Sequence, residues 1–184
     1  MAVYTKINNR DVLSLSKKFS IGKVIKFNGI KQGIENTNYL LQTNNKRYIL
    51  TIFEKRVKKK DLPFFMKLMD KLNKKNITCP KPLKDNNGNY LNKIKNKTAC
   101  IVTFLNGKDK KNLNYKNCFE VGKNIGKLHK ASASLRLYRK NSMSINNLDS
   151  LLKSIKFKSK KNSNLKKFLI QNLNNIKKNW PSKL

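Results

Sequence analysis

Acidic residues are scarce in this chain of 184 residues: nine Asp and Glu stand against 43 Lys and Arg, which gives a formal net charge of +34. Such a charge suggests binding to nucleic acid or to an anionic surface. Only five of the basic residues are arginine, the residue whose planar fork grips bases and phosphates bidentately. The 38 lysines and 28 asparagines are spread over the whole chain, which is typical of an AT-rich coding sequence. A basic RNA- or polyanion-binding protein therefore stays an alternative and is not the first interpretation.

Other absences exclude whole classes of protein. The sequence contains no run of 18 apolar residues, so no transmembrane helix is predicted. The first residues lack the apolar stretch of a secretory signal. Cys79, Cys100 and Cys118 are odd in number and far apart, and there is a single histidine, so neither a disulfide framework nor a zinc site is expected. We interpret the cysteines as buried small hydrophobic residues of a cytoplasmic protein.

The first part of the chain predicts a small antiparallel sheet with one packed helix. A short helix is expected over residues 11–19, and a longer one after Asp61, with Pro63 in its first turn. In the first strand, Ile25 and Phe27 are expected to share one face, because strand side chains alternate. Strands are predicted over residues 23–28, 39–43, 47–53 and 98–105, with one more before the last of these.

After Gly107 the pattern becomes helical, so we expect two regions, residues 1–107 and 108–184. Three sets of apolar residues recur at helical spacing and predict three helical stretches. These sets lie within residues 118–129, 148–155 and 165–180.

No single motif gives strong evidence for a catalytic or binding site. Gly122–Leu128 resembles a phosphate-binding P-loop, but it has three residues between its glycines where four are needed, and Leu follows its lysine. His129 ends an apolar helical stripe, as a structural histidine does. The polar loop at 29–38 lies between two predicted strands and contains glycine, so its backbone could close over phosphates like the lid of a kinase small lobe. No H-x-D-x-x-x-x-N catalytic loop occurs, and the last acid is Asp149.

Several segments that follow one another along the chain give stronger evidence than any single motif. They resemble the aminoglycoside-phosphotransferase-like homoserine kinases of bacterial threonine biosynthesis, most densely over residues 1–107. A looser similarity continues through VGKNIGKLH at 121–129. The densest segments are MAVYTK at 1–6, GIENTNYLL at 33–41, RYILTIFEKRV at 47–57, DLPFFMKLM at 61–69, CPKPL at 79–83 and IVTFLNG at 101–107.

The resemblance implies an α+β, protein-kinase-like fold, in which a small antiparallel sheet lobe with one packed helix precedes the first helices of a larger helical lobe. It also implies a set of nucleotide-binding residues. In related kinases a lysine of this strand contacts the nucleotide phosphates, and Thr51 stands at about its position. Lys55 or Arg56 could make the phosphate contact instead. Asp70 stands where the lysine's partner acid is expected. The implied nucleotide-binding residues are Gly33, Asn36 and Asn38 in the phosphate-covering loop, Thr51, Asp70, and Thr103, Phe104 and Leu105 in the adenine-binding hinge.

The family transfers the γ-phosphate of ATP to the hydroxyl of L-homoserine in the cytoplasm. The resemblance therefore implies ATP with Mg²⁺, L-homoserine as the other substrate, no specific nucleic acid and no membrane. In the family the catalytic loop and the magnesium ligands follow the segment that matches 180–184. We expect the chain to be the N-terminal part of such a kinase and inactive by itself, with no catalytic or metal-binding residue of its own. A kinase-derived binding module without catalysis is a third possibility.

Overall fold

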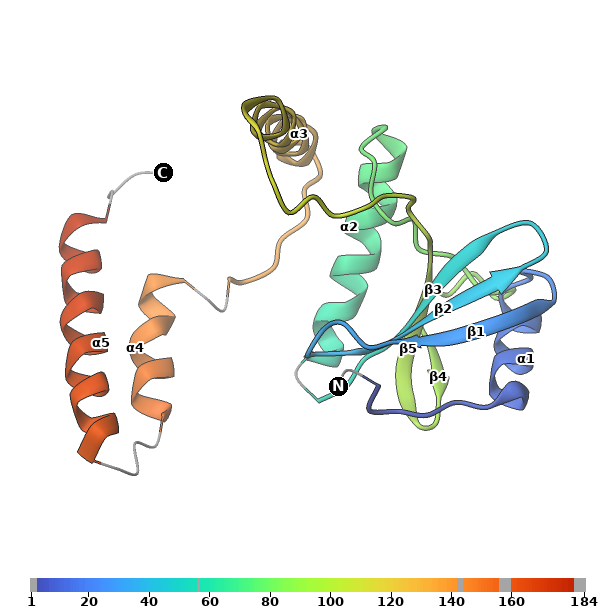
Figure 1. Ribbon diagram of the computed structural model, residues 1–184, viewed down its shortest axis with the longest axis horizontal. Helices are drawn as coiled ribbons and strands as arrows, with labels where there is room; N and C mark the ends of the chain where they lie inside the picture. Colours follow the sequence, from blue (N-terminus) through green and yellow to red (C-terminus); the bar gives the residue numbers. More distant parts are fainter. Residues whose placement is uncertain (1–2, 56, 142–143, 156–159, 181–184) are drawn as a thin grey trace. The chain divides into compact units, whose positions relative to one another are not determined.

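A computed structural model describes residues 3–55, 57–141, 144–155 and 160–180. The chain divides into two compact units, residues 1–138 and 139–184 (Figure 1). The first unit holds α1 (Asn9–Lys18), β1 (Val24–Ile30), β2 (Thr37–Thr43), β3 (Arg47–Ile52), the 3₁₀ turn η1 (Lys59–Asp61), α2 (Leu62–Lys74), β4 (Asn92–Ile94), β5 (Lys97–Thr103) and α3 (Tyr115–Ala133). The second holds α4 (Ile145–Ser154) and α5 (Lys160–Asn179).

The strands form one antiparallel sheet of five in the order β1-β2-β3-β5-β4. The predicted antiparallel sheet is thus confirmed, and its strands differ from the expected bounds by one or two residues. The expectation that Ile25 and Phe27 share one face of the sheet is wrong, because the register of β1 against β2 shifts between Val24 and Lys26. This bulge interrupts the alternation of side chains, so Phe27 packs on the core while Ile25 is exposed.

Helices cover both faces of the sheet. Alternate residues of β3 and β5 point to opposite sides, so Leu50 and Ile101 belong to the larger core, together with Val12 and Leu15 of α1. On the other face, Cys100 and Val102 pack against Met66 of α2. α1 begins with a capping box, in which the side chains of Asn8 and Asp11 each accept the other's backbone N–H.

The three cysteines differ in their burial. Cys100 is buried, and this burial raises the pKa of its thiol to about 12. Cys79 is half-buried, whereas Cys118 on α3 is exposed. The expectation of buried small hydrophobic residues therefore holds for Cys100 and is wrong for Cys118.

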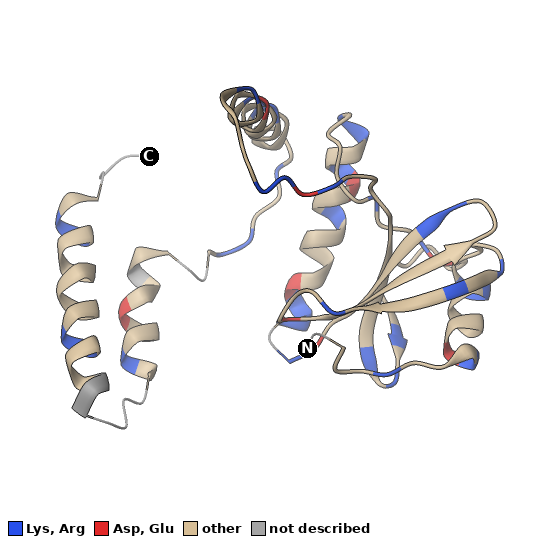
Figure 2. Ribbon diagram, in the orientation of Figure 1, with Lys and Arg blue, Asp and Glu red and all other residues tan. Residues whose placement is uncertain are grey.

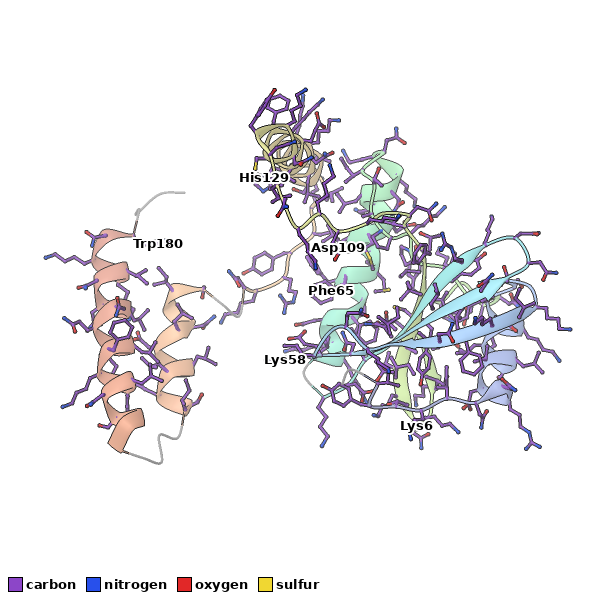
Figure 3. All side chains as sticks on the ribbon, in the orientation of Figure 1. Lys6, Lys58, Phe65, Asp109, His129 and Trp180 are labelled. Atoms are coloured by element: carbon purple, nitrogen blue, oxygen red, sulfur yellow. The ribbon has the colours of Figure 1, made fainter. Side chains whose placement is uncertain are left out.

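The later helices leave much of their apolar surface exposed. α3 buries none of its residues, although a capping box of Asn114 and Asn117 starts it. His129 lies on α3 and is exposed (Figure 3). Within the second unit, α4 and α5 are linked by an ion pair between Asp149 and Lys177. Leu173 of α5 is buried, whereas Phe168 and Trp180 stay exposed.

Candidate functional site

The loop between β1 and β2 contains a glycine in a left-handed backbone conformation. Gly33 has a φ of +105°, in the region that side chains disfavour, and an added Cβ there would meet open space. The residues of this loop from Lys31 to Glu35 are exposed. The side chain of Asn36 is turned back, because its Oδ1 accepts the backbone N–H of Glu54 at 3.4 Å.

Next to this loop, the sheet presents a polar cross-strand row on the face that α2 partly covers. Asn38 of β2 lies opposite Thr51 of β3, which lies opposite Cys100 of β5. Residues directly opposite each other share a face of the sheet. The Thr51 hydroxyl donates to Asn38 Oδ1 at 2.8 Å. The structure thus brings two of the expected phosphate-side residues together.

An apolar row crosses the same face two residues further along. Leu40 of β2 lies opposite Ile49 of β3, which lies opposite Val102 of β5. Leu40 and Ile49 are half-buried, so part of their surface stays accessible. Two residues along a strand span about 7 Å, so the polar and apolar rows are neighbours on one surface. These apolar residues were missed by the sequence reasoning, although the register of two predicted strands could have indicated them.

The expected hinge leaves β5 at the apolar end of this surface. Two of its backbone N–H groups are already used: that of Thr103 donates to Lys81 O at 2.9 Å, and that of Phe104 to Arg47 O at 3.2 Å. The guanidinium of Arg47 also lies 4.3 Å from the centre of the Phe104 ring. Leu105 is exposed, and its N–H has no partner among the described residues. A groove of about 550 Å³ is lined by residues 42–48 around the β2–β3 turn and by Thr103, Phe104 and Asn106, and not by the residues of the two rows.

Asp70 lies on α2 and is engaged by its own helix. Its carboxylate pairs with Lys74 at 2.9 Å. The hydrogen bond from Lys74 lowers the pKa of Asp70 below its ordinary value, and a hydrogen bond with Tyr90 adds to this. Among the contacts of the described residues, none joins Asp70 to Thr51. The polar row therefore holds a hydroxyl and an amide, with no lysine–carboxylate pair across it.

A carboxylate on the opposite face, whose side chain is only 9% exposed, was also missed. Glu54, two residues after the end of β3, accepts hydrogen bonds from Thr5 at 2.6 Å and Thr37 at 2.7 Å, and it pairs with Lys97. Burial alone would raise the pKa of Glu54, but the hydrogen bonds from Lys97, Thr5 and Thr37 outweigh it and lower the pKa. Of the two residues expected to replace the missing lysine, Lys55 is exposed next to Glu54, and Arg56 lies outside the described residues.

Two further features bear on the chemistry. Among the described residues, no three His, Cys, Asp or Glu side chains gather where they could hold a metal ion. No helix in the described part of the chain is both long and apolar enough to cross a membrane.

The sheet, with its glycine-containing loop between β1 and β2, agrees with a comparison of whole sequences. The model of the phosphotransferase enzyme family matches residues 26–183. The chain belongs to this phosphotransferase family. The predicted family and its α+β, kinase-like fold are thereby confirmed.

Homoserine kinases are among the relatives of this phosphotransferase chain. The homoserine kinase of Bartonella tribocorum is 41% identical over 145 residues, which cover 79% of this chain and 46% of that protein. Those of Bartonella henselae and Paramagnetospirillum magneticum are 36% and 35% identical over 185 residues, with 99% and 100% of this chain covered and 57% of each relative. The chain thus spans about half the length of the curated relatives it matches.

Solved structures agree on the fold. Spectinomycin phosphotransferase, solved in complex with ADP and spectinomycin, matches with a TM-score of 0.60 and 16% sequence identity, over 95% of this chain and 56% of that one. An AMP-bound structure of the same enzyme matches with a TM-score of 0.55 and 18% identity.

Proposed function

We propose that this chain is the nucleotide-binding part of an ATP-dependent homoserine kinase, an enzyme of threonine biosynthesis that acts in the cytoplasm. The observation that carries the proposal is the identity of 35–41% to homoserine kinases, which for two of them extends over essentially the whole chain. In the reaction, the hydroxyl oxygen of L-homoserine attacks the γ-phosphorus of ATP, the bond to the bridging oxygen breaks, and ADP leaves. The hydroxyl proton is released.

The two rows of the sheet support a placement of the nucleotide. The adenine would lie against Leu40 and Ile49, with its edge at Thr103–Leu105, where the N–H of Leu105 is available. The phosphates would lie under the loop of Gly33, beside Asn38 and Thr51. Positively charged or hydrogen-bond-donating groups at this end stabilise phosphate oxygens. Without a lysine at position 51, the donors offered here are backbone N–H groups and the amide of Asn38.

Mg²⁺ accompanies ATP in this proposal, but the described residues do not form a site for it. Phosphoryl transfer needs carboxylates or amides that hold the metal and an acid that positions the attacking hydroxyl. Asp70 is paired with Lys74, and no metal-binding cluster exists among the described residues. No step is therefore assigned to a magnesium ligand of this chain, and the sequence contains no H-x-D-x-x-x-x-N segment.

Titration calorimetry of the 184-residue chain with ATP tests the nucleotide part of the proposal. The chain should bind ATP, and Gly33→Val should weaken binding about tenfold, because strain at a positive φ costs roughly 1–3 kcal/mol and a side chain hinders the approach of the phosphates. Gly88→Val is the matched control: Gly88 has a φ of +82° in the turn between α2 and β4, outside the loop at 31–36. This variant should lose stability and keep its affinity for ATP. Wild-type protein that binds no adenine nucleotide would contradict the proposal.

The catalytic part is tested by homoserine-dependent release of ADP. We expect the 184 residues alone to give no rate above a blank without protein, because they contain no H-x-D-x-x-x-x-N segment to supply the catalytic carboxylate, and such groups contribute orders of magnitude in rate. Turnover by this polypeptide would overturn the view that it supplies the nucleotide-binding part only.

A further inference from the structure

The first described residues, 3–5, lie across the sheet as a strap, which we call the N-terminal strap. The backbone N–H groups of Tyr4 and Thr5 both donate to Thr37 Oγ1, at 2.9 and 3.1 Å. Thr37 is the first residue of β2 and is completely buried. The strap is therefore fixed at the point where the candidate phosphate loop enters the sheet.

A second set of contacts anchors the strap at Thr5. Its carbonyl accepts a hydrogen bond from the Tyr39 hydroxyl at 2.9 Å. Its hydroxyl donates to Glu54 Oε1 at 2.6 Å and accepts from Lys97 Nζ at 2.7 Å. Thr5 is buried, so these bonds are shielded from competing water. The strap is thus tied to β2, to β5 and to Glu54, which lies two residues after β3.

Close packing holds the strap on the side of β1. A Cβ added to Gly29 would lie 2.8 Å from Val3 Cγ2 and 3.5 Å from the ring of Tyr39. The first distance is shorter than side chains tolerate, so a glycine at position 29 is what lets Val3 lie against the strand. The strap therefore rests on β1 as well.

From this anchored backbone, one side chain reaches the candidate phosphate loop. The hydroxyl of Tyr4 donates to the carbonyl oxygen of Ile34 at 3.1 Å. Ile34 directly follows Gly33, the residue with φ of +105°, and its side chain is 71% exposed. The apolar side chain of Ile34 therefore does not hold the loop by burial, and the loop tip is joined to the strap through the Tyr4 hydroxyl.

We propose that Tyr4 is a positioning residue for nucleotide phosphates: the N-terminal strap, through the Tyr4 hydroxyl, holds the loop at 31–36 in the conformation in which its backbone faces the phosphates. This rests on the proposed function, because the ligand is the nucleotide assigned above. Tyr4 touches no nucleotide itself. It reduces the freedom that the loop would otherwise lose on binding, as preorganisation does.

The variant Tyr4→Phe removes the hydroxyl and keeps the ring. Its affinity for ATP should fall by about two- to tenfold, the range expected for one hydrogen bond, while its affinity for adenosine, which has no phosphates, stays unchanged. The ratio of the two affinities is the measurement, because a general loss of structure would lower both. Tyr138→Phe, at a tyrosine that is 88% exposed, is the control and should leave the ratio unchanged.

Amide hydrogen exchange of residues 33–36 reports on the loop without any ligand. Tyr4→Phe should speed exchange there and leave exchange in β3 unchanged. Gly29→Ala, which pushes against Val3, should also speed exchange in the loop, and Val3→Ala in the same chain should restore it.

The outcomes separate the two proposals. If the wild-type chain binds neither ATP nor adenosine, the proposed function fails, and the nucleotide role of Tyr4 fails with it, even where exchange in the loop is faster. If the wild-type chain binds both, an unchanged affinity ratio in Tyr4→Phe, or unchanged exchange at residues 33–36, overturns the role of the strap and leaves the proposed function standing.

Discussion

Glu54 combines burial with charge, which makes its protonation matter for stability. Its carboxylate accepts hydrogen bonds from two threonine hydroxyls and from Lys97. Although burial opposes the charged form, these hydrogen bonds hold its pKa below the ordinary value of 4.5. A group whose pKa is lower in the folded than in the unfolded chain stabilises the fold when it is ionised. The stabilisation is complete above the ordinary value and is lost as the pH falls through the lowered one.

Glu54→Gln should therefore destabilise the chain at pH 7 by about 1–3 kcal/mol, the cost of a charged hydrogen-bonded partner. Urea unfolding at pH 7 and at decreasing pH below 4.5 measures the effect, and the difference from wild type should shrink towards acid. Glu120→Gln on α3, where the glutamate is exposed, serves as control and should change stability little at either pH. A difference that stays constant down to pH 2 would contradict the role assigned to the ionised carboxylate.

Individual residues differ in how far sequence predicts them. Gly33 could be assigned to a loop because glycine acts locally, whereas Asn38, which was expected in the same loop, lies in β2. Glu54 could not be recognised, because its partners Thr37, Lys97 and Thr5 lie 17, 43 and 49 positions away. The strap could be noticed only through the resemblance of its segment to a known family, since residues 3–5 have no periodic pattern of their own. Which residues bind the nucleotide stays a prediction.

At the scale of elements, α2 and α3 were both predicted from apolar residues at helical spacing, but they differ in the structure. α2 buries Leu62, Met66 and Leu72, whereas α3 buries no residue. Periodicity indicates which face of a helix is apolar, but it does not say whether another element covers that face. The bulge in β1 was missed for a similar reason, since one extra residue in a strand leaves no mark in composition.

Two phenylalanines one hundred positions apart test this difference. Phe19 ends α1 and is 5% exposed, while Phe119 on α3 is 67% exposed. Phe19→Ala should cost about 3–5 kcal/mol of unfolding free energy through the lost burial and the cavity left behind. Phe119→Ala should change it by no more than about 0.5 kcal/mol. Thermal or urea unfolding of both variants is the measurement, and equal losses would mean that the face of α3 is covered in solution.

At the scale of the whole molecule, the net charge of +34 is distributed rather than gathered in one place. Lys and Arg lie on helices, strands and loops of both units (Figure 2). The aromatic residues of the sheet strands are buried or half-buried, as Tyr48 and Phe27 show, whereas Tyr115, Phe119 and Phe168 on the later helices are exposed. The spread of Lys and Arg over both units favours the phosphotransferase interpretation over a dedicated RNA-binding protein.

The chain should nevertheless bind heparin or RNA weakly and without sequence preference. Binding through distributed lysines releases counterions, so the logarithm of the association constant should fall linearly and steeply with the logarithm of salt concentration. Fluorescence anisotropy with two unrelated RNA sequences between 50 and about 200 mM salt, the range over which this loss is large, measures it. A sequence-selective complex that survives the higher salt would instead support the RNA-binding alternative.

The bond between Thr5 and Lys97 also has a consequence for biosynthesis. The two residues stand 92 positions apart. At the usual speed of about 5–20 residues per second, a ribosome makes Lys97 roughly 5–18 s after Thr5. The hairpins of β1, β2 and β3 join neighbouring segments and can form within that interval, but the ammonium group that completes the contacts of Thr5 and Glu54 is not yet present. Thr5 and its neighbours are therefore locked into place only after Lys97 has been made.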